Sequence, residues 1–558
     1  MEDEKNAPLI QIDFKSLIPY LVFFGLVLIL LLSSGLNNRP PEVEKLIPKV
    51  SRPGDELVIT GRYFGSARNG GRVEVAGVSP PSSAYLEWRN NKISLIVPEE
   101  MKGGILRVVT KHGRSRQVVP FTNKRYLPVV LSGPREPGEP YISDVDPESG
   151  FVGTEVTIKG LNFGLGRGDS VVFFSWIPEK VDRKTEADEE STMLPAAEYD
   201  YDYVSWNDRE ITVRVPDGAS SGNIRVMTDK GLSNAVYFEV KDLVGNKLFS
   251  DRRILHVQRS LEIQDVQADP GNGLYLWFPR IWSAPEQREI ELVSVEPEPM
   301  FDDYKGSMLF FFEDLKPGDR KTVNVDFIFS RYAVETNVNA SRVRHAYDES
   351  QKLFQVYASP NSLVPSANET LRSVAGNVVG RERNPYGKAW LLYSYTLDRL
   401  AYSANPGGIG VVEALNTRTG NAYHYSLLFC SLARAAGLPA RPVAGYLVTG
   451  RGACIRHTWA EFYLEKVGWI PVDPLLGDGV KFGDLGVQAG ARNAYFGGLD
   501  NRHMTLSKGL VSLEKMNPNG RQVTRREAAG FQSVQEESVG NLYSYSSRWG
   551  ELKLLGMY

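Results

Sequence analysis

The fold is decided by two neighbouring segments, TRTGNAYHYSLLFCSLARAAGLPARPVAGY (417–446) and RHTWAEFYLEKVGWIPVDP (456–474). In the first segment apolar residues recur at helical spacing, which predicts a helix that ends near Gly437. In the second segment apolar and polar residues alternate over 456–464, which predicts a strand. A tight turn at Gly468 then returns the chain, so the second segment predicts a β-hairpin.

This hairpin predicts a pair of titratable side chains. His457 and Asp473 lie at similar distances from the turn, so they face each other across the two strands, where side chains are roughly 5 Å apart. An aspartate beside a histidine can orient the imidazole and stabilise its charged form. The sequence therefore predicts that Asp473 holds His457.

The same segments resemble the transglutaminase-like superfamily, a relative of papain-type thiol enzymes. LFCSLARAAGLPARPVAGY, HTWAEFY and GWIPVDP are similar to three motifs of that family and occur in its order and spacing. The resemblance covers residues 345–510 and implies an α+β transglutaminase-like (papain-like) domain with a Cys–His–Asp triad. His457 and Asp473 match the last two members. Ala422 stands at the position of the family's cysteine, and His424 stands where the family prefers aspartate.

Alanine has no nucleophile, and we expect no other residue to replace the cysteine. Cys430 lies eight residues further along the predicted helix, about 12 Å away. Cys454 precedes His457 by three residues, and an odd offset on a strand places it on the opposite face. Ser426, one turn into the helix, needs stronger activation than a thiol. The resemblance thus implies a pseudoenzyme whose His457 and Asp473 are vestigial.

Composition bounds the remaining possibilities. A chain of 558 residues predicts three to five domains. A net charge of -3 gives no basic face for nucleic acid. The two cysteines and six histidines form no metal-ligand spacing, so we expect neither a metal nor another cofactor.

An apolar segment near the N-terminus predicts a single-pass membrane anchor at residues 17–36, because Leu17 to Leu32 is almost wholly apolar. A cleaved signal peptide is the alternative, but no A-x-A-like site or lipid-accepting cysteine follows. Lysine and arginine flank the segment on both sides, so charge does not fix the orientation. The β-rich modules downstream favour a cytoplasmic N-terminus, 1–16, and an extracytoplasmic remainder, as in a bacterial cell envelope.

A repeated module follows the anchor at 46–131 and 140–241. GDELVITGRYFG, YLEW and ISLIVP of the first copy match GTEVTIKGLNFG, YVSW and ITVRVP of the second. Short alternating strands with Gly and Pro turns predict two small β-sandwiches. The motifs resemble the IPT/TIG immunoglobulin-like family, whose modules serve as spacers or binding surfaces. The second copy is roughly 19 residues longer because of an acidic stretch, 179–202, which we expect to be a mobile loop.

Two further regions complete the expected architecture. Strand-like segments separated by Pro and Gly turns over 252–343 predict another β-sandwich of about six strands. The region 511–558 is expected to pack on the transglutaminase-like domain as a C-terminal extension.

Three functions are consistent with the sequence. The first is a membrane-anchored, extracytoplasmic binding or scaffolding protein whose cleft holds a protein or peptide partner. The second is an active thiol peptidase, amidase or acyl transferase that uses Cys430 or Cys454. The third is a structural stalk. The missing cysteine argues against catalysis and favours the first.

Overall fold

The computed structural model describes residues 22–23 and 39–558, apart from 49, 52, 102–103, 118, 124–137, 178–191, 409, 482–484, 487 and 526–527. The chain forms two compact units, Met1–Val129 and Val130–Tyr558. Of the predicted anchor, only residues 22 and 23 are described. Within the described part of the chain, no helix is long and apolar enough to cross a bilayer.

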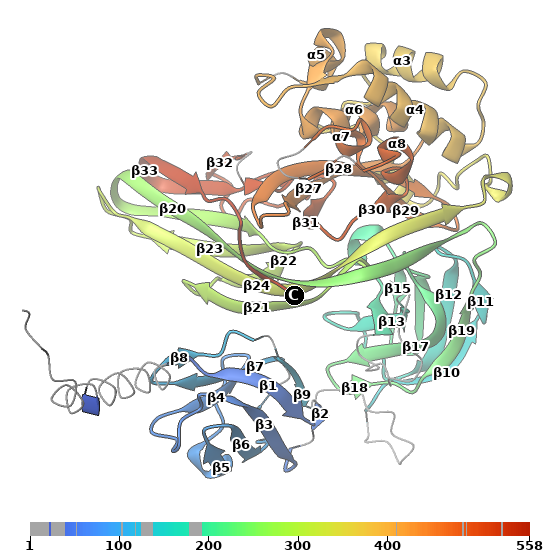
Figure 1. Cartoon of the computed structure of the whole chain (residues 1–558). Helices are drawn as coiled ribbons and strands as arrows, with labels where there is room; N and C mark the ends of the chain where they lie inside the picture. The colour runs from blue at the N-terminus through green and yellow to red at the C-terminus, as the bar shows by residue number, and fades with distance from the viewer. Residues whose placement is uncertain are drawn as a thin grey trace, which may run out of the picture. The chain divides into compact units, whose positions relative to one another are not determined.

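The first unit contains a sandwich of two β-sheets (Figure 1). One sheet has the order β1-β3-β6-β5 and the other β2-β9-β7-β4, with β8 paired to β7. Alternate residues of the facing strands, such as Ile59 and Val108, are fully buried between the sheets. The strands are β1 (Glu42–Ile47), β2 (Val50–Ser51), β3 (Glu56–Arg62), β4 (Arg72–Val75), β5 (Tyr85–Arg89), β6 (Lys92–Ile96), β7 (Gly104–Thr110), β8 (Gly113–Arg114) and β9 (Val119–Asn123).

The second unit begins with a module of the same topology. Its first sheet, β10-β12-β16-β15, repeats the order β1-β3-β6-β5. In both copies an indole Nε1 donates to the carbonyl of a buried phenylalanine, Trp88 to Phe64 and Trp206 to Phe163, each at 2.9 Å. The internal repeat predicted from the sequence is therefore also a structural repeat. Its strands are β10 (Tyr141–Asp146), β11 (Ser149–Gly150), β12 (Glu155–Leu161), β13 (Val171–Ser175), β14 (Met193–Pro195), β15 (Tyr203–Trp206), β16 (Glu210–Arg214), β17 (Ser220–Thr228), β18 (Gly231–Leu232) and β19 (Val236–Val240).

The acidic stretch of this module differs from the expected loop. Residues 178–191 lie outside the described residues, but the stretch that follows forms β14 and a 3-10 helix, Glu198–Asp200. Tyr199 and Tyr201 pack against rings of other domains, Trp282 and Tyr357. Sequence periodicity could not predict this order, because the contacts that hold the stretch come from distant parts of the chain.

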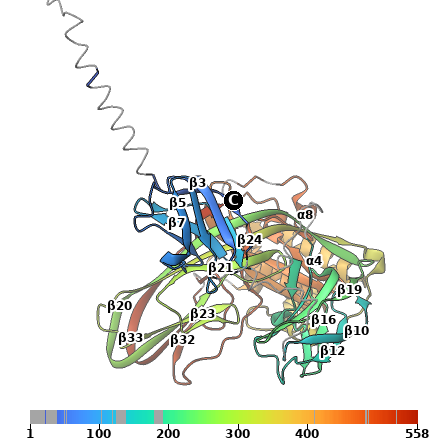
Figure 2. The same ribbon diagram turned by 90° about the horizontal axis from the view of Figure 1, so that it is seen from below.

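The β-rich domain is one nine-stranded sheet rather than the separate six-stranded sandwich expected. Its main path is β21-β24-β20-β23-β22, and β20 (Gly245–Pro279) runs through the whole domain. The C-terminal strand β33 pairs with β20, and the two strands lie side by side in both views (Figures 1 and 2). The other strands are β21 (Gln287–Glu296), β22 (Phe301–Tyr304), β23 (Ser307–Glu313), β24 (Lys321–Val338), β30 (Gly498–Leu499), β32 (Arg521–Val523), β33 (Glu536–Trp549) and β34 (Lys553–Met557).

This pairing corrects the place expected for the C-terminal extension. β33 and β34 both pair with β20, so the end of the chain completes the β-domain instead of packing only on the transglutaminase-like domain. The reason is that the long strand β20 offers a hydrogen-bonding edge that no local pattern in 511–558 reveals.

The last domain packs helices on a four-stranded sheet with the order β29-β28-β27-β31 (Figure 1). The helix predicted within 417–446 is confirmed as α6, and Gly437 follows it with a φ of 80°. The elements are α2 (Lys352–Tyr357), α3 (Glu369–Val379), α4 (Pro385–Arg399), β25 (Ala401–Tyr402), α5 (Val411–Thr417), β26 (Thr419–Gly420), α6 (Ala422–Ala435), β27 (Ala440–Val448), β28 (Cys454–Leu464), β29 (Gly468–Val472), α7 (Pro474–Gly477), α8 (Ala491–Ala494) and β31 (His503–Lys508).

Candidate functional site

Helix α6 begins at Ala422, the position that corresponds to the family's cysteine. Asn421 caps the helix, and a reciprocal capping box links it to His424: the Asn421 side chain bonds the backbone of His424, and the Asn421 N–H donates to His424 Nδ1 at 3.4 Å. Such a box satisfies backbone donors that the first helical turn otherwise leaves open. His424 therefore has a structural role at the helix start.

The structure brings His457 and Asp473 together. His457 Nε2 lies 2.6 Å from Asp473 Oδ2, and both side chains are fully buried. Asp473 also caps α7, because its Oδ1 accepts from the backbone N–H of Leu476 at 2.9 Å. The hairpin register differs from the expected one by two residues: Ala460 pairs with Val472, so Asp473 lies diagonal to His457. The pair forms because a histidine ring reaches its diagonal neighbour.

A second histidine, which the sequence did not reveal, completes this cluster. His503 Nε2 lies 3.0 Å from the same Asp473 Oδ2, and its Nδ1 lies 2.9 Å from Asp500 Oδ1. Burial disfavours the imidazolium, but Asp500 and Asp473 together raise the pKa of His503 to about 9. At neutral pH both ring nitrogens therefore carry hydrogens, and each donates to a carboxylate.

The two carboxylates respond to this cation. Burial opposes ionisation, but His457 and His503 hold the pKa of Asp473 below its ordinary value. Burial likewise opposes ionisation of Asp500, whose pKa His503 lowers to about 2. The local signal for His503 was its spacing of three residues from Asp500. Its approach to Asp473 depends on the pairing of β31 with β27, which no sequence period specifies.

The three side chains could also be considered as a metal site. His457, Asp473 and His503 each offer one ligand atom, and these atoms lie within 4.8 Å of one another. Ligands at about 2.1 Å from one tetrahedral ion are separated by roughly 3.4 Å. The 2.6 Å contact between His457 and Asp473 is shorter, and both nitrogens of His503 already bond carboxylates. The geometry fits a chain of hydrogen bonds better than a metal centre.

A cleft of about 920 Å³ lies beside the His457–Asp473 pair. Asn421, Ala422 and His424 line it from the start of α6, and His457 lines it from β28. The C-terminal segment 529–533 forms another part of the wall. The structure thus places Ala422 and His457 in the wall of one cleft.

The remaining candidate nucleophiles do not serve this cleft. Ser426 Oγ lies 2.8 Å from the carbonyl oxygens of both Ala422 and Thr458, so its hydroxyl ties α6 to β28. Cys430 is fully buried among helix side chains, and burial raises the pKa of its thiol well above the ordinary range. Cys454 packs against the β-domain cluster, and burial raises its pKa to about 12. A thiol reacts as its thiolate, so both are poor nucleophiles at neutral pH.

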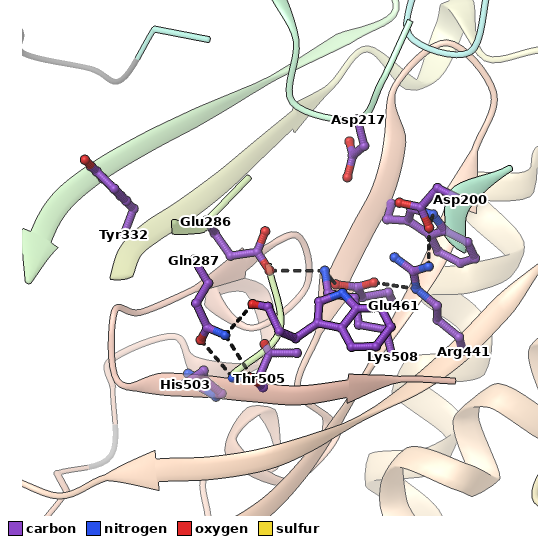
Figure 3. A network of polar contacts seen from close by, with 12 residues as sticks. Asp200, Asp217, Glu286, Gln287, Tyr332, Arg441, Glu461, His503, Thr505 and Lys508 are labelled. Carbon is purple, nitrogen blue, oxygen red and sulfur yellow. Dashed lines mark hydrogen bonds and ion pairs between the residues drawn. The ribbon is translucent and has the colours of Figure 1, made fainter. Parts of the chain in front are cut away.

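A buried ionic network adjoins the site on β28 (Figure 3). Glu461 Oε1 accepts from Lys508 Nζ, and its Oε2 accepts from Arg441 Nε, both at 2.8 Å. Arg441 also pairs with Asp200 of the second repeat module, and Trp469 Nε1 donates to the same carboxylate at 3.1 Å. The strand that carries His457 is therefore tied to the second repeat module through this network.

Comparisons with known proteins agree with this architecture. Residues 372–474 match the family model of the Transglutaminase-like superfamily, and residues 140–240 match that of the IPT/TIG domain. The chain thus carries a transglutaminase-like core and an IPT/TIG domain, as the sequence motifs predicted.

Two curated relatives match part of the chain. One is a protein-glutamine gamma-glutamyltransferase from Pseudomonas aeruginosa, 35% identical over 99 residues that cover 15% of each chain. The other is an uncharacterized protein from Haemophilus influenzae, 28% identical over 122 residues that cover 17% of this chain and 33% of the relative. The chain therefore spans no more than about a third of the length of either relative.

Solved structures with some similarity include a putative cysteine protease from Cytophaga hutchinsonii, 14% identical, with a TM-score of 0.37 over 56% of this chain and 93% of that one. The periplasmic domain of TgpA from Pseudomonas aeruginosa is 17% identical, with a TM-score of 0.24 over 40% of this chain and 86% of that one.

Proposed function

We propose that this protein is a membrane-anchored, extracytoplasmic binding or scaffolding protein whose transglutaminase-like domain is a pseudoenzyme. The observation that carries the proposal is Ala422 at the start of α6, in the wall of a cleft that also contains His457. The apolar segment at 17–36 supports the anchor, and the exported domain of the Pseudomonas relative supports the location.

The state of the two thiols supports a binding role. Covalent catalysis in a thiol enzyme needs a thiolate that an imidazole can reach. Cys430 and Cys454 lie in two different apolar clusters, and burial raises the pKa of both. The cleft has a volume of about 920 Å³ and is lined by a helix N-terminus and by His457, so it has room for an extended peptide but no thiol to react with it.

The preserved His457–Asp473 pair needs no catalytic role on this proposal. Both groups are fully buried and hydrogen-bonded, and Asp473 also bonds His503 and Leu476. Removing one partner of such a group leaves an uncompensated buried charge, which costs about 3–5 kcal/mol. On this proposal the pair contributes to the stability of the fold and takes part in no reaction.

An activity assay tests the proposal directly. The full chain, purified in detergent, is offered amide and glutamine-containing peptide substrates with an amine acceptor. We expect no thiol-dependent hydrolysis or transfer above background. Turnover that iodoacetamide abolishes would reject the pseudoenzyme and support an enzyme that uses Cys430 or Cys454.

Binding distinguishes the scaffold from a structural stalk. Partners captured from envelope extracts by the wild-type chain are compared with those of a variant in which Thr524→Trp places a large ring at an exposed position of the cleft wall. A scaffold loses a partner in this variant. A stalk keeps the same set, and that outcome would contradict a binding role for the cleft.

A further inference from the structure

A second cavity, of about 930 Å³, lies where the second IPT/TIG-like module meets the β-domain. The module contributes 194–200 and Asp217, the β-domain contributes 280–285 and 303–306, and Lys508 of β31 also reaches it. Among the described residues, its lining has no member in common with that of the cleft beside His457. Ligand-binding sites are often cavities of this volume at the junction between two domains.

The charges that line this junction cavity are neutralised within the protein. Its wall contains both cationic and acidic side chains, and most of them belong to short ion pairs. These pairs are Arg167–Glu198 at 2.6 Å, Arg280–Asp303 at 3.2 Å, Lys508–Glu461 at 2.8 Å and Asp217–Lys247 at 2.6 Å. A ligand with a strong net charge of either sign would meet repulsion as well as attraction here. The lining instead offers many hydrogen-bonding atoms whose charges largely compensate one another.

Aromatic rings from both domains line the same cavity. Tyr199 of the module and Trp282 of the β-domain pack with ring centroids 4.8 Å apart. Tyr304, on the edge strand β22, stands at the rim with 39% of its surface exposed. Because Trp282 is buried, the exposed ring surface belongs to Tyr199 and Tyr304. Such rings beside polar groups suit a ligand with one apolar and one hydroxylated face.

We propose that the junction cavity binds a neutral oligosaccharide. A pyranose ring presents C–H groups that pack on aromatic faces, and its hydroxyl groups both donate and accept hydrogen bonds. Carboxylates such as Asp217 can accept hydrogen bonds from the hydroxyl groups, and cations such as Arg280 can donate hydrogen bonds to them. Each of these charges is already balanced by its ion-pair partner, so the ligand does not need a charge of its own. This site is separate from the peptide cleft and does not depend on whether the protein is a pseudoenzyme.

The test is a titration of the full chain with neutral trisaccharides of glucose and of N-acetylglucosamine. The detergent must have no sugar headgroup, because such a headgroup would compete. Binding is measured by calorimetry and by tryptophan fluorescence, which Trp282 should report. Sulfated trisaccharides and acidic peptides serve as charged comparisons.

Two tyrosine variants assign the binding to the cavity. Tyr304→Ala removes an exposed ring at the rim and should weaken binding at least tenfold. Tyr543→Ala removes an exposed ring on β33, which is not part of the lining, and should change binding less than twofold. The proposal is overturned if no neutral trisaccharide binds at millimolar concentration, if both variants bind alike, or if a charged probe binds more tightly than the neutral ones.

Discussion

Restoring the cysteine by Ala422→Cys asks whether the cleft still activates a thiol. The new side chain would stand at the first residue of α6, where the helix dipole favours an anion. It would share the cleft with His457, which Asp473 holds at 2.6 Å. Thiols in such surroundings have pKa values of about 3.5–7.5, compared with about 8.5 for a free cysteine.

The expected rate follows from these values. At pH 5.5 a thiol with a pKa of about 6.5 is roughly 9% thiolate, whereas a free cysteine is roughly 0.1% thiolate. The lower pKa reduces intrinsic nucleophilicity by about eightfold at a Brønsted slope of about 0.45. The net expectation is labelling about tenfold faster than that of a free thiol at this pH.

The assay measures iodoacetamide labelling at pH 5.5 by mass spectrometry of the peptide that contains position 422. The same variant unfolded in urea supplies the free-thiol reference rate. Adding His457→Gln should remove most of the acceleration, because the imidazole no longer pairs with the thiolate. If the labelling rate of the folded variant equals the reference rate and His457→Gln does not change it, the argument that the cleft can activate a thiol is refuted.

Three further variants test the supports of the site. Asp200→Ala removes a partly buried counter-ion of the buried Arg441 side chain and should lower the free energy of unfolding in urea by about 3 kcal/mol. The exposed-pair control Asp398→Ala should change it by less than about 1 kcal/mol, and equal effects would contradict the anchoring role. The imidazolium of His503 stabilises the fold below pH 6.5, and because its pKa is about 9 this contribution, on the order of 3 kcal/mol, is lost as the pH rises from 6.5 to 9. His503→Gln should flatten that decline, and a slope like that of the wild type would show that another group causes it. A Cβ at Gly445 would lie 1.8 Å from the Met504 carbonyl oxygen, so Gly445→Ala should lower the thermal midpoint by several degrees through loss of the β27–β31 pairing, and an unchanged midpoint would contradict it.

The sequence predicted the parts of the site that depend on local periods. The α6 helix, its end at Gly437 and the hairpin that joins His457 to Asp473 follow from spacing within about 60 residues. The family motifs identified Ala422 as the residue at the position of the family's cysteine. Comparisons with known proteins bear out the fold of this region, and the loss of catalysis stays a prediction.

The features that the sequence missed depend on distant pairing. His503 reaches Asp473 only because β31 pairs with β27, and β33 joins β20 across more than 250 residues. Neither contact can be predicted from the spacing of apolar and polar residues in the sequence. The order of Tyr199 and Asp200 was hidden for the same reason, because an acidic stretch without apolar periodicity resembles a solvated loop until its partners are known.

The extra residues of the second module make contacts with another domain that the first module lacks the residues to make. Both copies share one topology, but only the second carries the segment whose Asp200 reaches Arg441 and Trp469. An ancestor that exchanged the two copies by recombination would have left that arginine short of a counter-ion. The second copy is therefore joined to the transglutaminase-like domain by contacts that the sequence of the first copy could not supply.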